Sequence, residues 1–251
     1  MTANAPALSV VIITYNEENR IEECLQSVRF AGEIIIVDSY STDRTKEIAE
    51  RFPVRFSERK FDNFSSQKNH ALSLASGNWI LLIDADERVS PELRSEIQAL
   101  LASHPANCAY EIKRTAYFFG KPLRYSGTQT DAPIRLFPRG SVRYEQLIHE
   151  KIVTPLSVRR LQSKLIHHTT ENMAQFTQKL GPYMKLEIET LKNGQKPVTV
   201  LDIYGRPAAR FFQRLFLQGG LLDGMTGLRF AVLSAYYEFK KWNGYRREIK
   251  K

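Results

Sequence analysis

Two aspartates separated by one residue, Asp84 and Asp86, carry the clearest chemical signal in the sequence. They follow the apolar run WILLI at residues 79–83, which is typical of a buried strand. Side chains two positions apart on an extended chain project to the same side, so we expect both carboxylates to face one site. Hard oxygen ligands of this kind hold Mg²⁺ or Mn²⁺, and such ions usually bridge to phosphate oxygens. A solvated acidic turn is the plain alternative, but the preceding strand favours a metal site.

Short apolar runs alternate with helical patterns before and after this motif. LSVVIIT (8–14) and EIIIVD (33–38) are typical of buried strands, and we expect Asn16 to cap the helix between them. The alternation predicts βαβ units and an α/β fold with a Rossmann-like, mostly parallel sheet. Ligands bind beyond the carboxyl ends of such strands. Asn16, Asp38 and the two aspartates should therefore gather at one edge of the sheet.

Further helices are expected after Ser41 or Thr42, from Ser65 and Ser66, and from Ser90-Pro91-Glu92. Residues 109–145 are rich in aromatic residues, Gly and Pro, which predicts short mixed strands and long loops. Beyond them we expect a helix over residues 170–193, a second one starting at Gly205, and a last one ending at Trp242.

Charge is distributed unevenly along the 251 residues. Residues 1–100 carry 11 basic and 16 acidic side chains, whereas residues 101–251 carry 25 basic and 11 acidic ones. A basic half indicates an anionic partner such as nucleic acid, phospholipid or a phosphorylated substrate. The sequence contains no nucleic-acid-reading motif, so we expect no nucleic acid among its partners. Only two cysteines are present, which excludes a disulfide framework and fits a reducing compartment.

The last fifty residues carry ten basic and four acidic side chains. Arg206, Arg210 and Arg214 recur at every fourth position beside several phenylalanines, which fits a helix at a membrane interface or an ordinary amphipathic helix. No segment is long and apolar enough to cross a membrane. We therefore expect a cytoplasmic protein that is peripheral to the inner membrane.

Three segments resemble, in order, the nucleotide-sugar domain of family 2 glycosyltransferases, which have the GT-A fold. The segments are LSVVIITYNEENRIEECLQSV, IIIVDSYSTDRTKEIA and QKNHALSLASGNWILLIDADERV. The resemblance covers roughly residues 7–102 without a break. More loosely, segments 134–152, 165–172 and 211–231 are similar to bacterial lipopolysaccharide inner-core β-1,4-glucosyltransferases. Neither GxGxxG nor a P-loop occurs, so the sheet belongs to neither of those nucleotide-binding classes.

This resemblance implies roles for particular residues. Those expected to line the base, ribose and diphosphate are Thr14, Tyr15, Asn16, Glu17, Asp38, Lys68, Asp84, Ala85 and Asp86. Asp38 would accept a hydrogen bond from the uracil ring, and Lys68 would lie near the diphosphate or the base. Asp86 would bind Mg²⁺ or Mn²⁺ directly, with Asp84 as the second candidate.

An inverting transfer also needs a general base. Family 2 enzymes use a carboxylate there, which implies Glu150, with Asp131 as the second candidate; a surface ion pair is the alternative for Glu150. In related enzymes a histidine shortly after the base completes the metal site. His167 fits that place, and His168, in the slot where the family has an aromatic residue, keeps the choice open.

Three arginines, Arg135, Arg139 and Arg143, recur at every fourth position, but Pro138 and Gly140 argue against a helix there. We interpret them as contacts to a phosphorylated or acidic acceptor. The resemblance as a whole implies a metal-assisted inverting glycosyltransferase that moves a sugar, with UDP-glucose as the expected UDP-sugar donor. The expected acceptor is a heptose of the lipopolysaccharide inner core, which is a lipid-linked phosphorylated saccharide at the inner-leaflet membrane surface.

The alternatives are a GT-A enzyme for another cell-envelope polysaccharide or a polyprenyl-phosphate acceptor, and a non-catalytic nucleotide-sugar or nucleic-acid binding protein. On the main interpretation the chain divides into three parts. Residues 1–102 form the nucleotide-sugar-binding part, 103–169 a mixed acceptor-side part, and 170–251 a basic helical extension that contacts the membrane.

Overall fold

The computed structural model describes residues 7–249 except 104, 106, 146–150 and 196. The chain forms two compact units, and each is described by itself. The first consists of Met1–Arg114 and Asp131–His167, and the second of Thr115–Thr130 and His168–Lys251. Residues 115–130, which the sequence grouped with the acceptor-side part, thus pack with the C-terminal helices.

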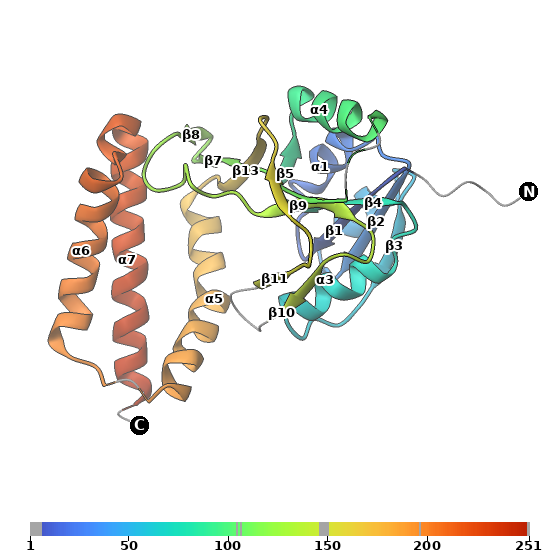
Figure 1. Cartoon of the computed structure of the whole chain (residues 1–251). Coiled ribbons are helices and arrows are strands. Elements are labelled where there is room, and N and C mark those ends of the chain that lie inside the picture. Colours follow the sequence, from blue (N-terminus) through green and yellow to red (C-terminus); the bar gives the residue numbers. More distant parts are fainter. Residues whose placement is uncertain (1–6, 104, 106, 146–150, 196, 250–251) are drawn as a thin grey trace, which may run out of the picture. The chain divides into compact units, whose positions relative to one another are not determined.

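A seven-stranded sheet forms the centre of the first unit (Figure 1). Its strands, in spatial order, are β12 (Val158–Arg160), β6 (Ala109–Glu111), β9 (Ile134–Pro138), β4 (Trp79–Asp84), β1 (Leu8–Thr14), β2 (Glu33–Asp38) and β3 (Arg55–Glu58). Only β9 runs antiparallel to its neighbours, β4 and β6. The α/β class with a mostly parallel sheet, predicted from the alternating pattern, is confirmed.

The strand register brings the predicted polar residues to one edge. Thr14 lies beside Asp38 in the β1–β2 pair, and Ile13 lies beside Asp84 in the β1–β4 pair. Three strands therefore end together, each followed by residues expected at the site.

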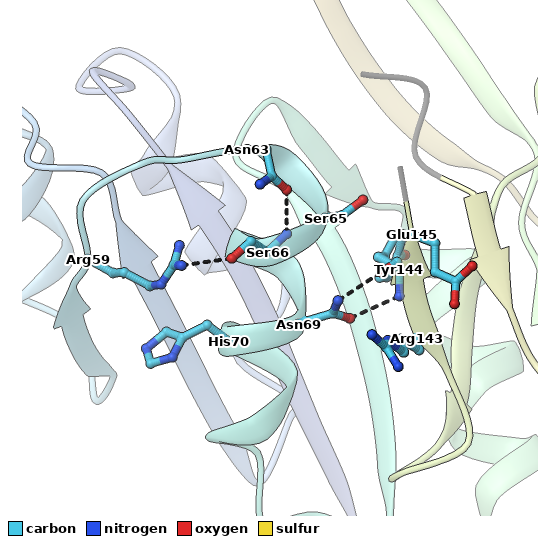
Figure 2. Close-up of a pocket in the computed structure, with 9 residues that line it drawn as sticks. All are labelled: Arg59, Asn63, Ser65, Ser66, Asn69, His70, Arg143, Tyr144 and Glu145. Atoms are coloured by element: carbon cyan, nitrogen blue, oxygen red, sulfur yellow. Dashed lines mark hydrogen bonds between the residues drawn. The ribbon is translucent and has the colours of Figure 1, made fainter. Parts of the chain in front are cut away.

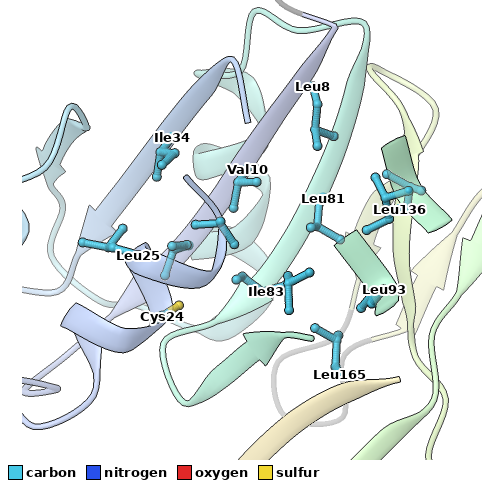
Figure 3. Packing of buried hydrophobic residues seen from close by; sticks show 14 of the residues in the cluster. Leu8, Val10, Cys24, Leu25, Ile34, Leu81, Ile83, Leu93, Leu136 and Leu165 are labelled. Atoms are coloured by element: carbon cyan, nitrogen blue, oxygen red, sulfur yellow. The ribbon is translucent and has the colours of Figure 1, made fainter. Parts of the chain in front are cut away.

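Alternating side chains of these strands pack on the two faces of the sheet. On one face, Val10, Ile12 and Leu81 belong to a buried cluster with residues of α1 (Ile21–Ser27), α2 (Thr45–Ala49) and α4 (Pro91–Ala102) (Figure 3). On the other, Val11 and Leu82 pack with α3 (Phe64–Ser73). Burial on both faces explains why these strands are continuous apolar runs.

Helix starts follow the sequence prediction in part. Ser90 caps α4 as predicted, and its Oγ accepts a hydrogen bond from the Leu93 N–H at 3.2 Å. The predicted cap at Asn16 is wrong, because Asn16 lies in a loop with φ 53° and α1 begins only at Ile21. The cap of α3 is Asn63 rather than Ser65 or Ser66.

Shorter strands complete the first unit. Strand β10 (Arg143–Glu145) pairs antiparallel with β11 (Lys151–Val153). Strand β5 (Glu87–Val89) pairs antiparallel with the first three residues of β13 (Leu165–Thr170). That pairing places His167 opposite Glu87.

In the second unit, β7 (Arg114–Phe118) pairs with β8 (Lys121–Leu123). The helical elements are α5 (Met173–Asn193), α6 (Arg206–Phe212) and α7 (Gly224–Glu248), with π-helical turns η1 (Leu201–Gly205) and η2 (Gln213–Leu217) and the 3₁₀ turn η3 (Gly220–Asp223). The helix predicted to start at Gly205 thus follows residues that are already helical from Leu201, and the last helix continues six residues beyond its predicted end at Trp242. Among the described residues, no helix has both the length and the apolar character needed to cross a membrane.

Candidate active site

The carboxylate of Asp38 is buried at the end of β2 and organises the adjoining loop. It accepts hydrogen bonds from the Ser41 N–H and Oγ, both at 2.6 Å. Ser41 Oγ also lies 2.8 Å from the Asn16 N–H, which donates to it. The amide oxygen of Asn16 accepts from the Thr42 N–H at 2.8 Å. The loops after β1 and β2 are therefore tied together at the site edge.

Flanking residues of the first loop differ in exposure. Thr14 is buried, with its Oγ1 3.5 Å from an Asp38 oxygen, whereas Tyr15 is exposed. The Glu17 N–H donates to Thr45 Oγ1 at 2.8 Å. Tyr15 is therefore exposed at the strand end where its neighbour Thr14 is buried.

Asp84 lies among three cationic side chains. Arg135 Nη2 is 2.5 Å from Asp84 Oδ2, and Lys68 Nζ and Arg114 Nη1 are each 4.0 Å from its carboxylate. Burial alone would raise the pKa of Asp84, but the charges of Arg135, Lys68 and Arg114 outweigh burial and hold its pKa well below the usual range. Asp84 is therefore ionised throughout the physiological range. Lys68 also lies over the Tyr144 ring, 5.2 Å from its centre.

A second carboxylate, Glu87, completes this network and was missed by the sequence analysis. It is fully buried, and its Oε1 lies 2.7 Å from Arg135 Nη2 and 3.0 Å from Arg114 Nη1. Its Oε2 accepts the Asp84 N–H at 2.9 Å. Glu87 thus fixes the backbone of the aspartate motif and both arginines. The only local signal was a third carboxylate directly after the motif.

Asp86 faces a different partner from Asp84. The chain leaves β4 at Asp84 and turns at Ala85 and Asp86, so the expected extended geometry, with both carboxylates on one side, is not observed. Asp86 Oδ1 lies 3.5 Å from His167 Nε2, and both side chains are largely buried. The two aspartates of the motif therefore occupy distinct electrostatic environments.

The Asp86–His167 pair fits a divalent cation. A carboxylate oxygen and an imidazole nitrogen are suitable donors for Mn²⁺, and Mg²⁺ is commonly held by one or two protein carboxylates together with substrate phosphates. In the part of the chain that the structure describes, no cluster of three or more His, Cys, Asp or Glu forms a complete protein cage. Asp86 and His167 would supply two donors to such an ion.

Other predicted residues are placed as follows. His168 belongs to the second unit, where its ring packs 5.3 Å from that of Tyr117. Asp131 forms an ion pair with Arg114 at 2.6 Å. Glu150, the predicted general base, lies outside the described residues.

The three predicted arginine contacts do not gather at one place. Arg135 is buried against Asp84 and Glu87, at the site edge of the sheet. Since β9 runs antiparallel to β4, the chain then leads away from the site, and the Arg139 N–H donates to the Asn78 carbonyl at the far end of β4. Arg143 is exposed at the start of β10.

A hollow of about 740 Å³ lies between α3 and β10 (Figure 2). The Asn69 amide connects its two walls, because it donates to the Tyr144 carbonyl at 2.8 Å and accepts from the Tyr144 N–H at 2.9 Å. The lining residues are Arg59, Asn63, Ser65, Ser66, Asn69, His70, Arg143, Tyr144 and Glu145. This lining is mostly polar and includes two arginines, which suits a hydroxyl-rich or anionic molecule.

Comparisons with known proteins identify the family of this chain. The family model described as glycosyl transferase family 2 matches residues 9–160. The lipopolysaccharide core biosynthesis glycosyltransferase LpsC of Rhizobium meliloti (strain 1021) is 31% identical, over 92% of this chain and 89% of that protein. An uncharacterized glycosyltransferase of Rickettsia bellii is 28% identical, over 92% of this chain and 83% of its own.

Among solved structures, S. aureus TarS in complex with UDP-GlcNAc is similar with a TM-score of 0.52 and 14% sequence identity. The similarity covers 96% of this chain and 92% of that one. At this identity the likeness concerns the fold, and it confirms the predicted GT-A fold.

Proposed function

This chain belongs to glycosyl transferase family 2, and on that premise we propose that it transfers glucose from UDP-glucose to a heptose of the lipopolysaccharide inner core. The observation that carries the transferase chemistry is the Asp86–His167 pair beside the Asp84 network at the ends of β1, β2 and β4. The choice of acceptor is supported by the similarity to LpsC over most of both chains.

In the proposed reaction, Asp38 accepts a hydrogen bond from the uracil ring, and Thr14, Tyr15, Asn16 and Glu17 line the base and ribose. Lys68 lies close enough to Asp84 to contact ribose or diphosphate oxygens at the same point. Asp86 and His167 would hold Mg²⁺ or Mn²⁺, which when bound supplies positive charge to the departing diphosphate. Arg135 and Glu87 keep the aspartate motif in place.

Glu150 is the proposed general base, which takes the proton of the attacking acceptor hydroxyl. Asp131 is the weaker candidate because its carboxylate already pairs with Arg114. Arg143, exposed at the hollow between α3 and β10, is proposed to contact an anionic group of the acceptor. We further propose that the enzyme works at the cytoplasmic surface of the inner membrane, where such an acceptor is held by its lipid.

The test is UDP release from a panel of UDP-sugars with Mn²⁺, with and without a chelator. We expect release from UDP-glucose that the chelator abolishes, and a loss on the order of a hundredfold in Asp86→Ala. Glu47→Ala, which removes an exposed carboxylate on α2, is the matched control and should retain full activity. Release that is indifferent to both the chelator and Asp86→Ala would refute the proposed role of the pair.

A further inference from the structure

The helical hairpin of the second unit has an exposed apolar face. Its two arms, η1–α6–η2 and α7, pack side by side and antiparallel (Figure 1). On α7 the exposed apolar side chains recur at every third or fourth position, so they form one stripe. The face consists of Leu201, Tyr204, Phe212 and Phe216 on the first arm and Met225, Leu228, Val232 and Tyr236 on α7. These eight side chains, which we call the hairpin face, are between 36% and 74% exposed.

An aromatic contact between the arms links the first arm to the edge of the α7 stripe. The Tyr204 ring lies 6.1 Å from the Phe239 ring, and Phe239 is three positions beyond Tyr236 on α7. Tyr204 therefore joins the stripe of the first arm to that of α7. Phe212 and Phe216 stack at 5.7 Å and continue the first stripe toward the turn.

The arginines of the first arm lie on its other side. Arg206 is over the Trp242 ring at 4.7 Å, and Arg210 pairs with Glu238 at 3.3 Å. Trp242 and Glu238 are both buried residues of α7. Arg206 and Arg210 thus contact buried residues of α7 while keeping part of their side chains exposed, and Phe212 and Phe216 are exposed on the first arm.

The surroundings of the hairpin face are positively charged. Arg229 and Lys240 are exposed on α7, and Lys240 lies over the Tyr236 ring at 5.5 Å. Each of the four carboxylates of residues 201–249 has a partner within the second unit. Three form ion pairs, which are Asp202 with Arg206, Glu238 with Lys241 and Glu248 with Lys192. The fourth, Asp223, accepts hydrogen bonds from the Arg124 and Tyr125 N–H groups. Positive charge therefore predominates beside an apolar surface.

We infer that the hairpin face is a docking surface for an anionic lipid bilayer. Its apolar side chains would lie at the boundary between the headgroups and the acyl chains, and Arg229 and Lys240 would lie at lipid phosphates. An apolar face with a basic margin is the pattern of a helix that lies in the membrane interface. Tyr204 and Tyr236 combine an apolar ring with a polar end, as that boundary requires. The choice of a bilayer as partner rests on the proposed function, while the face itself is independent of the catalytic residues.

The experiment is co-sedimentation of the full chain with two kinds of vesicle, phosphatidylcholine alone and phosphatidylcholine mixed with phosphatidylglycerol. We expect binding to the mixed vesicles that weakens as salt is raised. Phe212→Ser combined with Phe216→Ser should lower the partition coefficient by roughly tenfold or more. Arg229→Gln should lower it by roughly fivefold on mixed vesicles only.

Methionine provides a matched control within the same unit. Met225→Ser removes a side chain of the hairpin face that is 63% exposed and should weaken binding, whereas Met173→Ser removes one on α5 that is 48% exposed and should not. Wild type that stays in the supernatant with mixed vesicles, or a Phe212→Ser/Phe216→Ser chain that binds as well as wild type, would overturn the inference.

Two further readouts separate this inference from its rivals. If the chain is a dimer in lipid-free solution and the two phenylalanine substitutions make it monomeric, the face joins two copies and the bilayer inference fails. UDP release measured without vesicles tests the catalytic proposal separately, because Phe212 and Phe216 are not among the residues proposed to bind the nucleotide. Retained UDP release with absent vesicle binding would refute only the docking surface.

Discussion

Glu87 should be the most sensitive structural residue of the site, and Glu87→Ala is the perturbation that reveals it. The substitution removes a fully buried carboxylate that contacts Arg135, Arg114 and the Asp84 N–H. Of the two carboxylates that pair with the buried Arg135 among the described residues, Asp84 would remain, and the Asp84 N–H would lose the Glu87 acceptor. Breaking a buried ion pair from one side leaves an uncompensated charge in a poorly solvated environment.

The expected cost is about 3–5 kcal/mol in the free energy of unfolding. For a chain of this size, each kcal/mol lowers Tm by roughly 2–4 °C, so we expect a decrease on the order of 10 °C. Glu87→Gln retains the size of the side chain and an oxygen acceptor, so its cost should be smaller. Activity should fall in both variants, because Glu87 positions the backbone that carries Asp84 and Asp86.

The assay is chemical unfolding followed by tryptophan fluorescence, together with UDP release. The control is Glu47→Gln, since Glu47 is 58% exposed and pairs with Arg51 on the surface of α2. Such a pair contributes about 0.3–0.5 kcal/mol. If Glu87→Ala unfolds within about 1 kcal/mol of wild type, the buried network does not stabilise the site as reasoned.

Three further outcomes follow from the structure. Ser90→Ala removes the side-chain acceptor of the Leu93 N–H and should destabilise the protein by about 1 kcal/mol in chemical unfolding. The pKa of Asp84 is held below its unfolded-state value, so its stabilising contribution is complete above about pH 5 and is lost as pH falls through the folded-state pKa. Asp84→Asn should therefore flatten the loss of stability on acidification, and an unchanged acid slope would contradict this. Burial raises the pKa of Cys24 to about 12, so native protein should resist iodoacetamide near pH 9 by mass spectrometry, whereas unfolded protein should not.

The sheet could be predicted from the sequence because its signals are local. Residues 10–13, 34–37 and 79–83 are apolar without interruption, and the structure explains this by burial on both faces of the sheet. The start of α4 was equally readable, since Ser90 and Pro91 act within one helical turn. Asn16 was misinterpreted because its side chain bonds to Thr42, which is distant in sequence. In the sequence alone, a residue that caps a helix cannot be told from one that bridges two loops until its hydrogen-bond partner is known.

The site was predictable at its edge and not in its interior. Asp38, Asp84 and Asp86 follow strands, so topology alone predicts that they gather. The arginines that surround Asp84 come from β7 and β9, and nothing in local spacing indicates that Arg114 and Arg135 meet there. The same limit explains why three regularly spaced arginines were interpreted together, although the register of β9 separates Arg135 from Arg139.

The charges at this edge also bear on the proposed need for a metal. Arg135, Arg114 and Lys68 supply three positive charges, and Asp84, Glu87 and Asp131 supply three negative ones at contact distances of 2.5–4.0 Å. These six described residues balance one another, so they offer little net positive charge to an arriving diphosphate. Asp86 adds a further negative charge beside His167. A diphosphate would therefore meet repulsion here unless a divalent cation accompanied it. On this argument UDP should bind weakly without metal and tightly with it, and Asp86→Asn, which removes the repelling charge, should improve metal-free binding while abolishing the gain from Mn²⁺.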